Sequence, residues 1–231
     1  MRWADLDTLD HVNNVVYVEY AAEIRALLET DGLVPADAGI GSIAVRFVRP
    51  LLLTREPVVV LSTVDGDVLT QQICLDGDDG RTLHAEVVTT YGESAPARRR
   101  IDVPTLASTV RRTDLDGTGI VRHPRVFELF QEARILTISS RLSRLSPGSF
   151  VIGSSTVDFR SPIAWRPQAY AAGAWVDRIG RASFDIRAEL SDGDTVLASS
   201  TTTLVGFDLA AQSSRPFGDD ERAQLEGLIP A

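Results

Sequence analysis

The chain has 231 residues, of which 44% are hydrophobic and 24% charged, and its formal net charge at pH 7 is −9. This composition is typical of a folded globular protein, and the acidic balance argues against nucleic acid or an anionic membrane as a partner, because either would need a broad basic face. The longest apolar runs, such as Val58 to Leu61, are strand-sized and far below the roughly 20 residues of a membrane span, so we expect no span.

The N-terminus and the cysteine usage both indicate a cytoplasmic protein. Asp5, Asp7 and Asp10 lie where a signal peptide would have an apolar core, so we expect no export. The single cysteine, Cys74, cannot form an internal disulfide and lies in an apolar, strand-like run. We interpret it as a buried small hydrophobic residue and not as a catalytic one.

The first predicted elements are an acidic segment and a helix. The segment Arg2-Trp-Ala-Asp5-Leu-Asp7-Thr-Leu-Asp-His11-Val-Asn13-Asn14 leads into a helical pattern from Val15 to Leu28. Apolar residues recur there every three or four positions, which places them on one stripe of a helix. Gly32 is suited to the left-handed position that ends a helix.

Strands follow this helix and complete the first half. They are expected at residues 43–48, 57–64, 69–75 and 82–91, and the turns between them at 65–67 and 76–80 are rich in Asp and Gly, which tolerate a positive φ. One long helix followed by antiparallel strands predicts an α+β layer, with a curved antiparallel sheet wrapped around the helix.

The plan then repeats. A strand is expected from Leu106 to Arg112, a helix from Pro124 to Leu142, strands at 150–159, 169–176, 182–190 and 195–207, and a short helix near 222–228. Shifting Arg2 to Arg25 by 109 residues aligns them with Arg111 to Arg134, with eight identical pairs in 24 positions. About one or two are expected by chance. The internal repeat predicts two domains.

We therefore expect a first repeat at residues 1–95, a linker at 96–104, a second repeat at 105–210 and a tail with a short helix at 211–231. The repeats differ at their starts, because a full strand precedes the second acidic pair and only Met1 to Ala4 precede the first. Glu19, Glu23, Glu128 and Glu132 also repeat, and we interpret them as ion-pair partners of Arg25 and Arg134.

The repeated acidic pair has several interpretations. A calcium loop would need both Gly at its sixth position and Glu at its twelfth. The first copy has Asp10 and Val16 at these positions, and the second has Gly119 at the sixth but Arg125 at the twelfth, so neither copy has both residues. A carboxylate before a helix is often only a cap, which is an adequate account of Asp5 and Asp114. The other interpretation is catalytic.

The residues of both copies carry a family resemblance. The second copy, Asp114-Leu-Asp116-Gly-Thr-Gly119-Ile-Val-Arg-His123-Pro, resembles the catalytic segment of bacterial hotdog-fold acyl-CoA thioesterases of the 4-hydroxybenzoyl-CoA thioesterase type. The first copy resembles plant acyl-ACP thioesterases and long-chain acyl-CoA thioesterases of the same superfamily. The match extends to Phe-Val-Arg-Pro50 and Phe-Arg-Ser-Pro162. This resemblance implies a tandem, or double, hotdog.

The resemblance also implies roles for the residues of each copy. Asp116 and Asp7 would be the catalytic carboxylates, acting as nucleophile or as general base on water, and the backbone N–H groups of His123 and Asn14 would be the oxyanion donors. A helix start suits that role, because its N–H groups are unpaired and its partial charge is positive. His11 matches the histidine of the plant-type pattern, although Leu9 replaces the asparagine of that pattern.

Further expectations concern the substrate. We expect Asn13, Gly119 and Arg122 to contact it, and other arginines (Arg98, Arg99, Arg100, Arg125, Arg160 and Arg166) are candidates for coenzyme A phosphates. The expected function is hydrolysis of an acyl-CoA to free acid and thiol. A carboxylate can attack a thioester or deprotonate water without a metal, so we expect no metal and no cofactor other than the coenzyme A of the substrate.

Other classes stay open. The chain would be an acyl-ACP thioesterase if the substrate is attached to a carrier protein, or a non-catalytic protein that binds acyl thioesters. A hotdog hydratase would need an Asp-x4-His pattern, whereas this chain has Asp7-x3-His11. A homodimer of double hotdogs is a further expectation.

Overall fold

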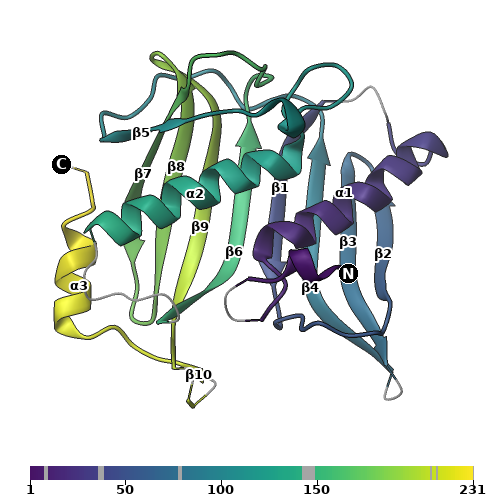
Figure 1. Cartoon of the computed structure of the whole chain (residues 1–231), viewed down its shortest axis with the longest axis horizontal. Helices are drawn as coiled ribbons and strands as arrows, with labels where there is room; N and C mark the ends of the chain where they lie inside the picture. The colour runs from purple at the N-terminus through teal and green to yellow at the C-terminus, as the bar shows by residue number, and fades with distance from the viewer. Residues whose placement is uncertain are drawn as a thin grey trace. The chain divides into compact units, whose positions relative to one another are not determined.

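The structure, a computed structural model, describes residues 1–7, 10–35, 39–77, 80–141, 149–208, 210–211 and 213–230. The chain divides into two compact units, Met1–Ser94 and Ala95–Ala231. In each unit one long helix lies across the strands of an antiparallel sheet (Figure 1). This is the α+β arrangement that the sequence predicts for each half.

The described residues of unit 1 form two helical segments and four strands. They are the short 3-10 helix η1 (Trp3–Asp5), α1 (Asn14–Thr30), β1 (Ile40–Phe47), β2 (Val58–Asp65), β3 (Val68–Gly77) and β4 (Gly80–Tyr91). The sheet order is β2-β3-β4-β1, and every neighbouring pair is antiparallel. The predicted helix and strands are all present, with ends shifted by a few residues. Residues 78–79 of the predicted 76–80 turn lie outside the described residues.

Local sequence sets both ends of α1. The side chain of Asn13 accepts a hydrogen bond from the Val15 N–H at 3.2 Å, so Asn13 is the N-cap. At the other end Gly32 has a φ of 68°, the left-handed conformation expected after the last turn. Val15, Val18 and Ala21 are buried on the side of the helix that faces the sheet.

Buried polar groups connect α1 to the rest of unit 1. The Tyr17 hydroxyl accepts a hydrogen bond from the Leu51 N–H at 2.9 Å, and its ring packs edge-on against Phe47. The Gln71 amide donates to the Ala21 carbonyl at 3.0 Å. Because each group is buried, loss of its partner would leave an uncompensated polar atom, so these bonds fix how the helix lies on its sheet.

Unit 2 repeats this plan and adds elements at both ends. It contains β5 (Thr105–Ser108), η2 (Arg112–Asp114), α2 (His123–Arg141), β6 (Phe150–Phe159), β7 (Tyr170–Ile179), β8 (Ser183–Asp192), β9 (Thr195–Asp208), β10 (Ser213–Ser214) and α3 (Asp219–Glu226). The sheet order is β6-β9-β8-β7-β5, with β10 paired to β9. The predicted helix end at Leu142 lies outside the described residues.

Both flanking segments pack on unit 2. The expected linker is attached to it by the Arg100 N–H, which donates to the Asp194 carbonyl at 2.9 Å, and by a β-bridge between Arg99 and Thr195. In the tail, Phe217 packs edge-on against the buried Phe184, with ring centroids 5.6 Å apart. The tail therefore adds to the core of the second unit, whereas the linker lies on its surface.

The two units differ at one sheet edge. In unit 2, β5 pairs with β7, whereas no described residue pairs with the outer edge of the corresponding strand β2 in unit 1. This matches the difference between the starts of the two repeats in the sequence.

Cys74 is buried and free, and burial raises the pKa of its thiol, as expected for a structural residue. Among the described residues, no helix has the length and apolar content to cross a membrane.

Candidate active site

In unit 2, Asp116 lies at the turn of a tight loop that leads directly into α2. Its backbone N–H donates to the Ile120 carbonyl at 2.8 Å, and the Gly119 N–H donates back to the Asp116 carbonyl at 3.2 Å. Gly119 has a φ of 86°, which a residue with a side chain rarely adopts. The loop closes with a β-bridge between Leu115 and Val121, two residues before the helix begins.

Unit 1 builds the same loop around Asp7. The Asp7 N–H donates to the His11 carbonyl at 2.7 Å, and the Asp10 N–H donates to the Asp7 carbonyl at 3.2 Å. Asp10 occupies the place of Gly119 and has a φ of 58°, and aspartate is one of the few residues that tolerate this conformation. Asp10 and Gly119 thus adopt the same left-handed backbone conformation at corresponding positions. The two copies therefore resemble each other in backbone conformation as well as in sequence.

Each loop is also attached to the segment that follows the first long strand of its sheet. The Val12 N–H donates to the Leu51 carbonyl, and the Val121 N–H donates to the Ile163 carbonyl, both at 2.8 Å. These bonds and the short path to the helix hold each aspartate close to the start of its long helix.

The first acid of each pair is a structural cap. Asp5 accepts a hydrogen bond from the Arg2 N–H at 2.6 Å, and Asp114 accepts one from the Arg111 N–H at 2.7 Å. Asp5 also accepts a bond from the Tyr20 hydroxyl at 2.9 Å. Each of these carboxylates caps the short 3-10 helix in which it lies, η1 or η2, and not the long helix that follows. The second acid of each pair remains the candidate for chemistry.

The Asp116 carboxylate is held as an anion by its own loop. Its Oδ1 atom accepts bonds from the Thr118 N–H at 2.8 Å, the Thr118 hydroxyl at 2.7 Å and the Ile120 N–H at 3.1 Å. Partial desolvation would raise the pKa of Asp116, but these bonds outweigh it, and the pKa lies below its usual value. All three of these bonds fall on Oδ1, which leaves Oδ2 the better placed oxygen for an incoming group.

The two aspartates differ in exposure. Asp7 is half-buried and its Oδ1 accepts a bond from the His11 N–H at 3.2 Å, whereas Asp116 is exposed. Asp116 is therefore more accessible to solvent than Asp7. The cause is local, since the loop turns its hydrogen-bond donors inward onto Oδ1 and leaves the rest of the carboxylate in solvent.

The remaining predicted site residues lie in the same two loops. Asn14 and His123 are the first residues of α1 and α2, the positions whose N–H groups have no acceptor within a helix. Asn13 caps α1, so its side chain already has a structural partner. Arg122 is half-buried, and its N–H donates to the Asp114 carbonyl at 2.9 Å. The ring of His123 packs edge-on against Phe159 at 4.6 Å.

Most of the arginines predicted to meet coenzyme A already have protein partners. Arg98 pairs with Glu189, Arg99 and Arg100 with Asp194, Arg125 with Glu128, and Arg166 with Asp192, while Arg160 donates to the Pro96 carbonyl and to Ser199. The sequence could not reveal these pairs, because most join residues far apart in the chain. In the described part of the chain, no cluster of three or more His, Cys, Asp or Glu side chains has the arrangement of a metal site.

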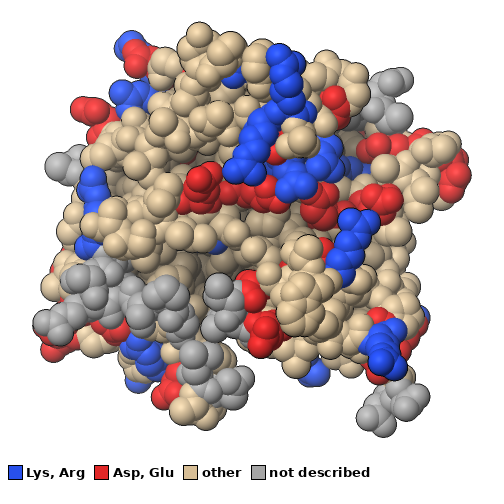
Figure 2. Space-filling model, in the orientation of Figure 1, with Lys and Arg blue, Asp and Glu red and all other residues tan. Residues whose placement is uncertain are grey.

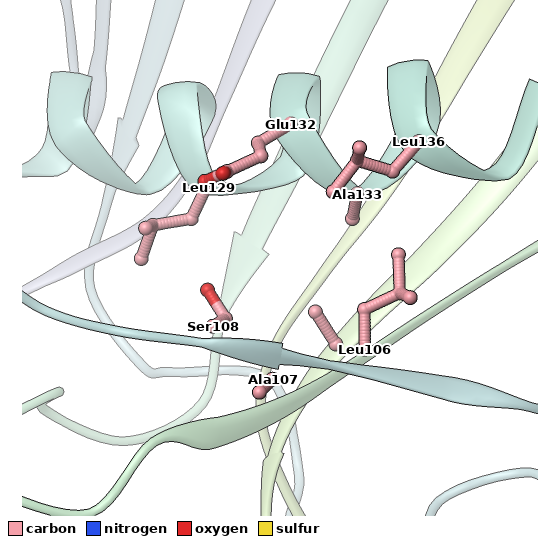
Figure 3. Close-up of a pocket in the computed structure, with 8 residues that line it drawn as sticks. Leu106, Ala107, Ser108, Leu129, Glu132, Ala133 and Leu136 are labelled. Carbon is pink, nitrogen blue, oxygen red and sulfur yellow. The ribbon is translucent and has the colours of Figure 1, made fainter. Parts of the chain in front are cut away.

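Two hollows lie outside the aspartate loops. A crevice of about 10 Å³ separates α2 from β5 (Figure 3), and its lining includes Leu129, Leu136 and Ser108. This is about the space that one water molecule needs, so the crevice does not hold an acyl chain as it stands. A larger, open hollow of about 280 Å³ is lined by Arg99, Arg100, Asp102 and Asp194 and includes no residue of the Asp116 loop.

The fold and the loops define a class of protein, in which a carboxylate is held beside the start of a helix that lies on a curved sheet. A profile of the Thioesterase-like superfamily matches residues 110–225, which is 116 of the 231 residues. A profile of the acyl-ACP thioesterase C-terminal domain matches residues 1–48. The chain belongs to the Thioesterase-like superfamily, and its class is that of the thioester hydrolases, as predicted.

Solved structures show the same fold. The 12:0-ACP thioesterase from Umbellularia californica has a TM-score of 0.67 at 11% identity, covering 89% of this chain and 91% of that one. A Lactobacillus plantarum protein described as a candidate oleoyl thioesterase has a TM-score of 0.66 at 11% identity, covering 90% and 94%. A thioesterase superfamily protein from Jannaschia sp. CCS1 has a TM-score of 0.51 at 20% identity, covering 58% and 98%.

These likenesses confirm the predicted hotdog fold. Nearly the whole length of the Jannaschia protein corresponds to little more than half of this chain, whereas the other two proteins match most of it. That is the relation expected for a tandem hotdog. A search of curated proteins found no match.

The geometry of Asp116 leads to a prediction about pH. Replacement of Thr118 by Val removes one hydrogen bond to Oδ1 but keeps the backbone N–H, so the pKa of Asp116 should rise toward its usual value. If the carboxylate form is the active one, the acid limb of kcat/KM should move to higher pH in an Asp7→Asn background. Thr118→Ser keeps the hydroxyl and is the control. Identical acid limbs for the two variants would contradict the prediction.

Proposed function

We propose that the chain hydrolyses an acyl-CoA thioester to free acid and thiol. In this proposal Asp116 and Asp7 are the catalytic carboxylates, acting as nucleophile or as general base on water. The backbone N–H groups of His123 and Asn14 stabilise the oxyanion that forms on the thioester carbonyl. The observation that carries the proposal is the repeated loop, in which the second acid of each pair is held by backbone bonds shortly before a helix start.

Two features of the loop suit this chemistry. The pKa of Asp116 lies below its usual value, so the group is a carboxylate at neutral pH, the form that can attack a carbonyl or accept a proton from water. A helix start presents N–H groups and a partial positive charge toward the position where negative charge develops. Since thiolate is a good leaving group, these two groups suffice without a metal.

Asn13, Gly119 and Arg122 belong to this proposal in different ways. Gly119 permits the turn that presents Asp116, and Asn13 fixes the first turn of α1, so both support the site through the backbone. Arg122 lies between the loop and the helix and is the candidate for direct contact with substrate. His11 closes the Asp7 loop through its backbone, and its ring is a candidate for orienting water.

The proposal is tested by thiol release from a series of acyl-CoA esters, measured with a thiol-reactive dye. Release that depends on enzyme concentration supports a hydrolase. Binding of the esters without release would overturn the proposal and support the alternative, a non-catalytic acyl-thioester-binding protein. Activity on acyl carrier protein with none on coenzyme A esters would support the acyl-ACP alternative.

The cytoplasmic location and the homodimer of double hotdogs also remain proposals. The homodimer can be tested by light scattering.

A further inference from the structure

Beside the Asp116 loop, an arginine is stacked on a tryptophan. The β-bridge between Ile120 and Ala164 brings the segment after β6 against this loop. The guanidinium of Arg112 lies 3.7 Å from the centroid of the Trp165 ring. Arg112 and Asp116 are four residues apart, so their Cα atoms are separated by at most about 14 Å. The stack is thus next to the proposed chemistry and within the same unit.

Ion pairs neutralise many, but not all, of the arginines of this acidic chain. All 23 basic residues are arginine, in a protein of net charge −9. In unit 2 many form ion pairs with carboxylates, among them Arg98, Arg99, Arg100, Arg125, Arg166, Arg178, Arg187 and Arg215. Arg111 and Arg112 are exposed, and neither forms an ion pair with any described residue. Two exposed arginines without a carboxylate partner among the described residues therefore lie shortly before Asp116 in the chain.

Stacking prepares Arg112 for an anion. A guanidinium that lies flat on an aromatic ring loses little conformational freedom on binding, and its edge keeps the N–H groups that match phosphate oxygens. Figure 2 shows basic side chains over the region where Figure 1 places the start of α2. Positive charge there favours an anionic ligand at the start of the helix.

The corresponding place in unit 1 has different chemistry. Trp3 aligns with Arg112 and Leu53 aligns with Trp165, and their side chains are 76% and 46% exposed. The first copy keeps an arginine at Arg2 but has no guanidinium stacked on a ring among its described residues. The anion-binding feature therefore belongs to the second copy only, although the aspartate loops are alike.

We propose that Arg111 and Arg112, the latter held on Trp165, bind the phosphate of a pantetheine-linked thioester whose carbonyl lies at Asp116. This proposal rests on the proposed thioesterase function and extends it, because it names the part of the substrate that is recognised and the copy that recognises it. The same phosphate chemistry occurs in coenzyme A and in the phosphopantetheine arm of acyl carrier protein. In the first copy, Trp3 and Leu53 occupy the corresponding positions and do not bind the phosphate.

Binding measurements test the proposal independently of turnover. The ligands are pantetheine, 4′-phosphopantetheine, coenzyme A and phosphopantetheinylated acyl carrier protein, with affinities measured by calorimetry. The unmodified protein should bind phosphopantetheine about tenfold more tightly than pantetheine, the effect of a charge-assisted contact in a partly exposed place. In the Arg111→Gln/Arg112→Gln variant this preference should disappear, while affinity for pantetheine stays unchanged. The preference should also weaken with added salt.

Control variants separate recognition from general charge. Arg141, at the far end of α2, is also exposed and forms no ion pair with described residues, so Arg141→Gln should keep the preference. Trp165→Leu, which copies Leu53, should reduce it while both arginines remain. Equal affinity of the unmodified protein for pantetheine and phosphopantetheine would overturn the proposal, as would a preference that survives the double variant. Neither result bears on Asp116, whose role is tested by hydrolysis of a phosphate-free N-acetylcysteamine thioester.

If the preference extends to only one carrier, the source of the phosphate is identified. Arginine-dependent binding of coenzyme A without binding of the carrier protein assigns the site to coenzyme A esters. Arginine-dependent binding of the carrier protein without binding of coenzyme A assigns it to acyl carrier protein. Both results support phosphate recognition at Arg111 and Arg112.

Discussion

Replacement of both Asp7 and Asp116 by Asn is expected to lower thioester hydrolysis by about 10²- to 10⁴-fold, the usual contribution of a catalytic acid or base. Asparagine has nearly the same shape and keeps an oxygen that can accept the loop hydrogen bonds at Oδ1. It cannot attack a thioester as a carboxylate does, and it is a far weaker base. The measurement is the rate of thiol release at saturating and at low substrate concentration, with circular dichroism as the check on folding.

The first acids of the two pairs supply the matched control. Asp5→Asn and Asp114→Asn change a carboxylate two residues away, in the same loops, where the structure shows a cap. This change should lower the free energy of unfolding by up to about 1 kcal/mol and leave hydrolysis nearly intact. Equal losses of activity for the two double variants would show that the loops need negative charge in general and would remove the special role of Asp7 and Asp116.

The single variants then show which repeat is active. A large loss for Asp116→Asn with little change for Asp7→Asn would assign turnover to the second copy, and the reverse result would assign it to the first. Comparable partial losses would indicate two working sites. Wild-type rates in the Asp7→Asn/Asp116→Asn variant would contradict the proposed mechanism altogether.

The fold could be predicted from the sequence because its determinants are local and repeated. The helical period of α1 and the Gly32 that ends it are read from residues close together in the chain, so the helix is encoded where it forms. The sequence did not predict that Asn13 is its N-cap. The strands alternate in the same way, and β6 has its predicted ends, Phe150 and Phe159. Small elements such as β10 were missed, because two residues carry no period.

Side-chain pairing was predicted less well, because it depends on tertiary position. Arg25 pairs with Glu29 at 3.5 Å, one helical turn away, and not with Glu23, which is only two residues away and faces a different direction. The Arg134 side chain is only 6% exposed and forms no ion pair with the described residues, and burial lowers its pKa to about 10. Sequence spacing alone could not distinguish these two environments.

In the candidate site too, features set by neighbouring residues in the chain were predicted, and features set by tertiary contacts were not. The motif located Asp116, Gly119 and His123 on one loop and helix start, which is a matter of chain neighbourhood. It did not reveal that Asp116 is exposed, nor that Arg112 stacks on Trp165, a residue 53 positions later in the sequence. A clue was present in the second repeat, where Arg112 and Trp165 replace the apolar Trp3 and Leu53 of the first.

A second large effect is expected from removal of two backbone N–H groups. Proline has no N–H and fits the first position of a helix, so Asn14→Pro and His123→Pro together should delete the proposed oxyanion donors while the helices keep their starts. The residue before a proline must be extended, and Asn13 already has a φ of −57° and a ψ of 135°. Loss of one such donor typically lowers kcat by about 10²- to 10³-fold.

The alanine variants Asn14→Ala and His123→Ala are the decisive comparison. They remove the same side chains, including the His123 ring that packs on Phe159, but keep both N–H groups. If the backbone stabilises the oxyanion, the alanine pair should retain most of the kcat and the proline pair should lose it at equal thermal stability. Similar rates in the two pairs would mean that the thioester oxygen is stabilised elsewhere. Since a backbone donor leaves no side-chain signature, only this substitution separates a helix start that binds an oxyanion from one that merely begins a helix.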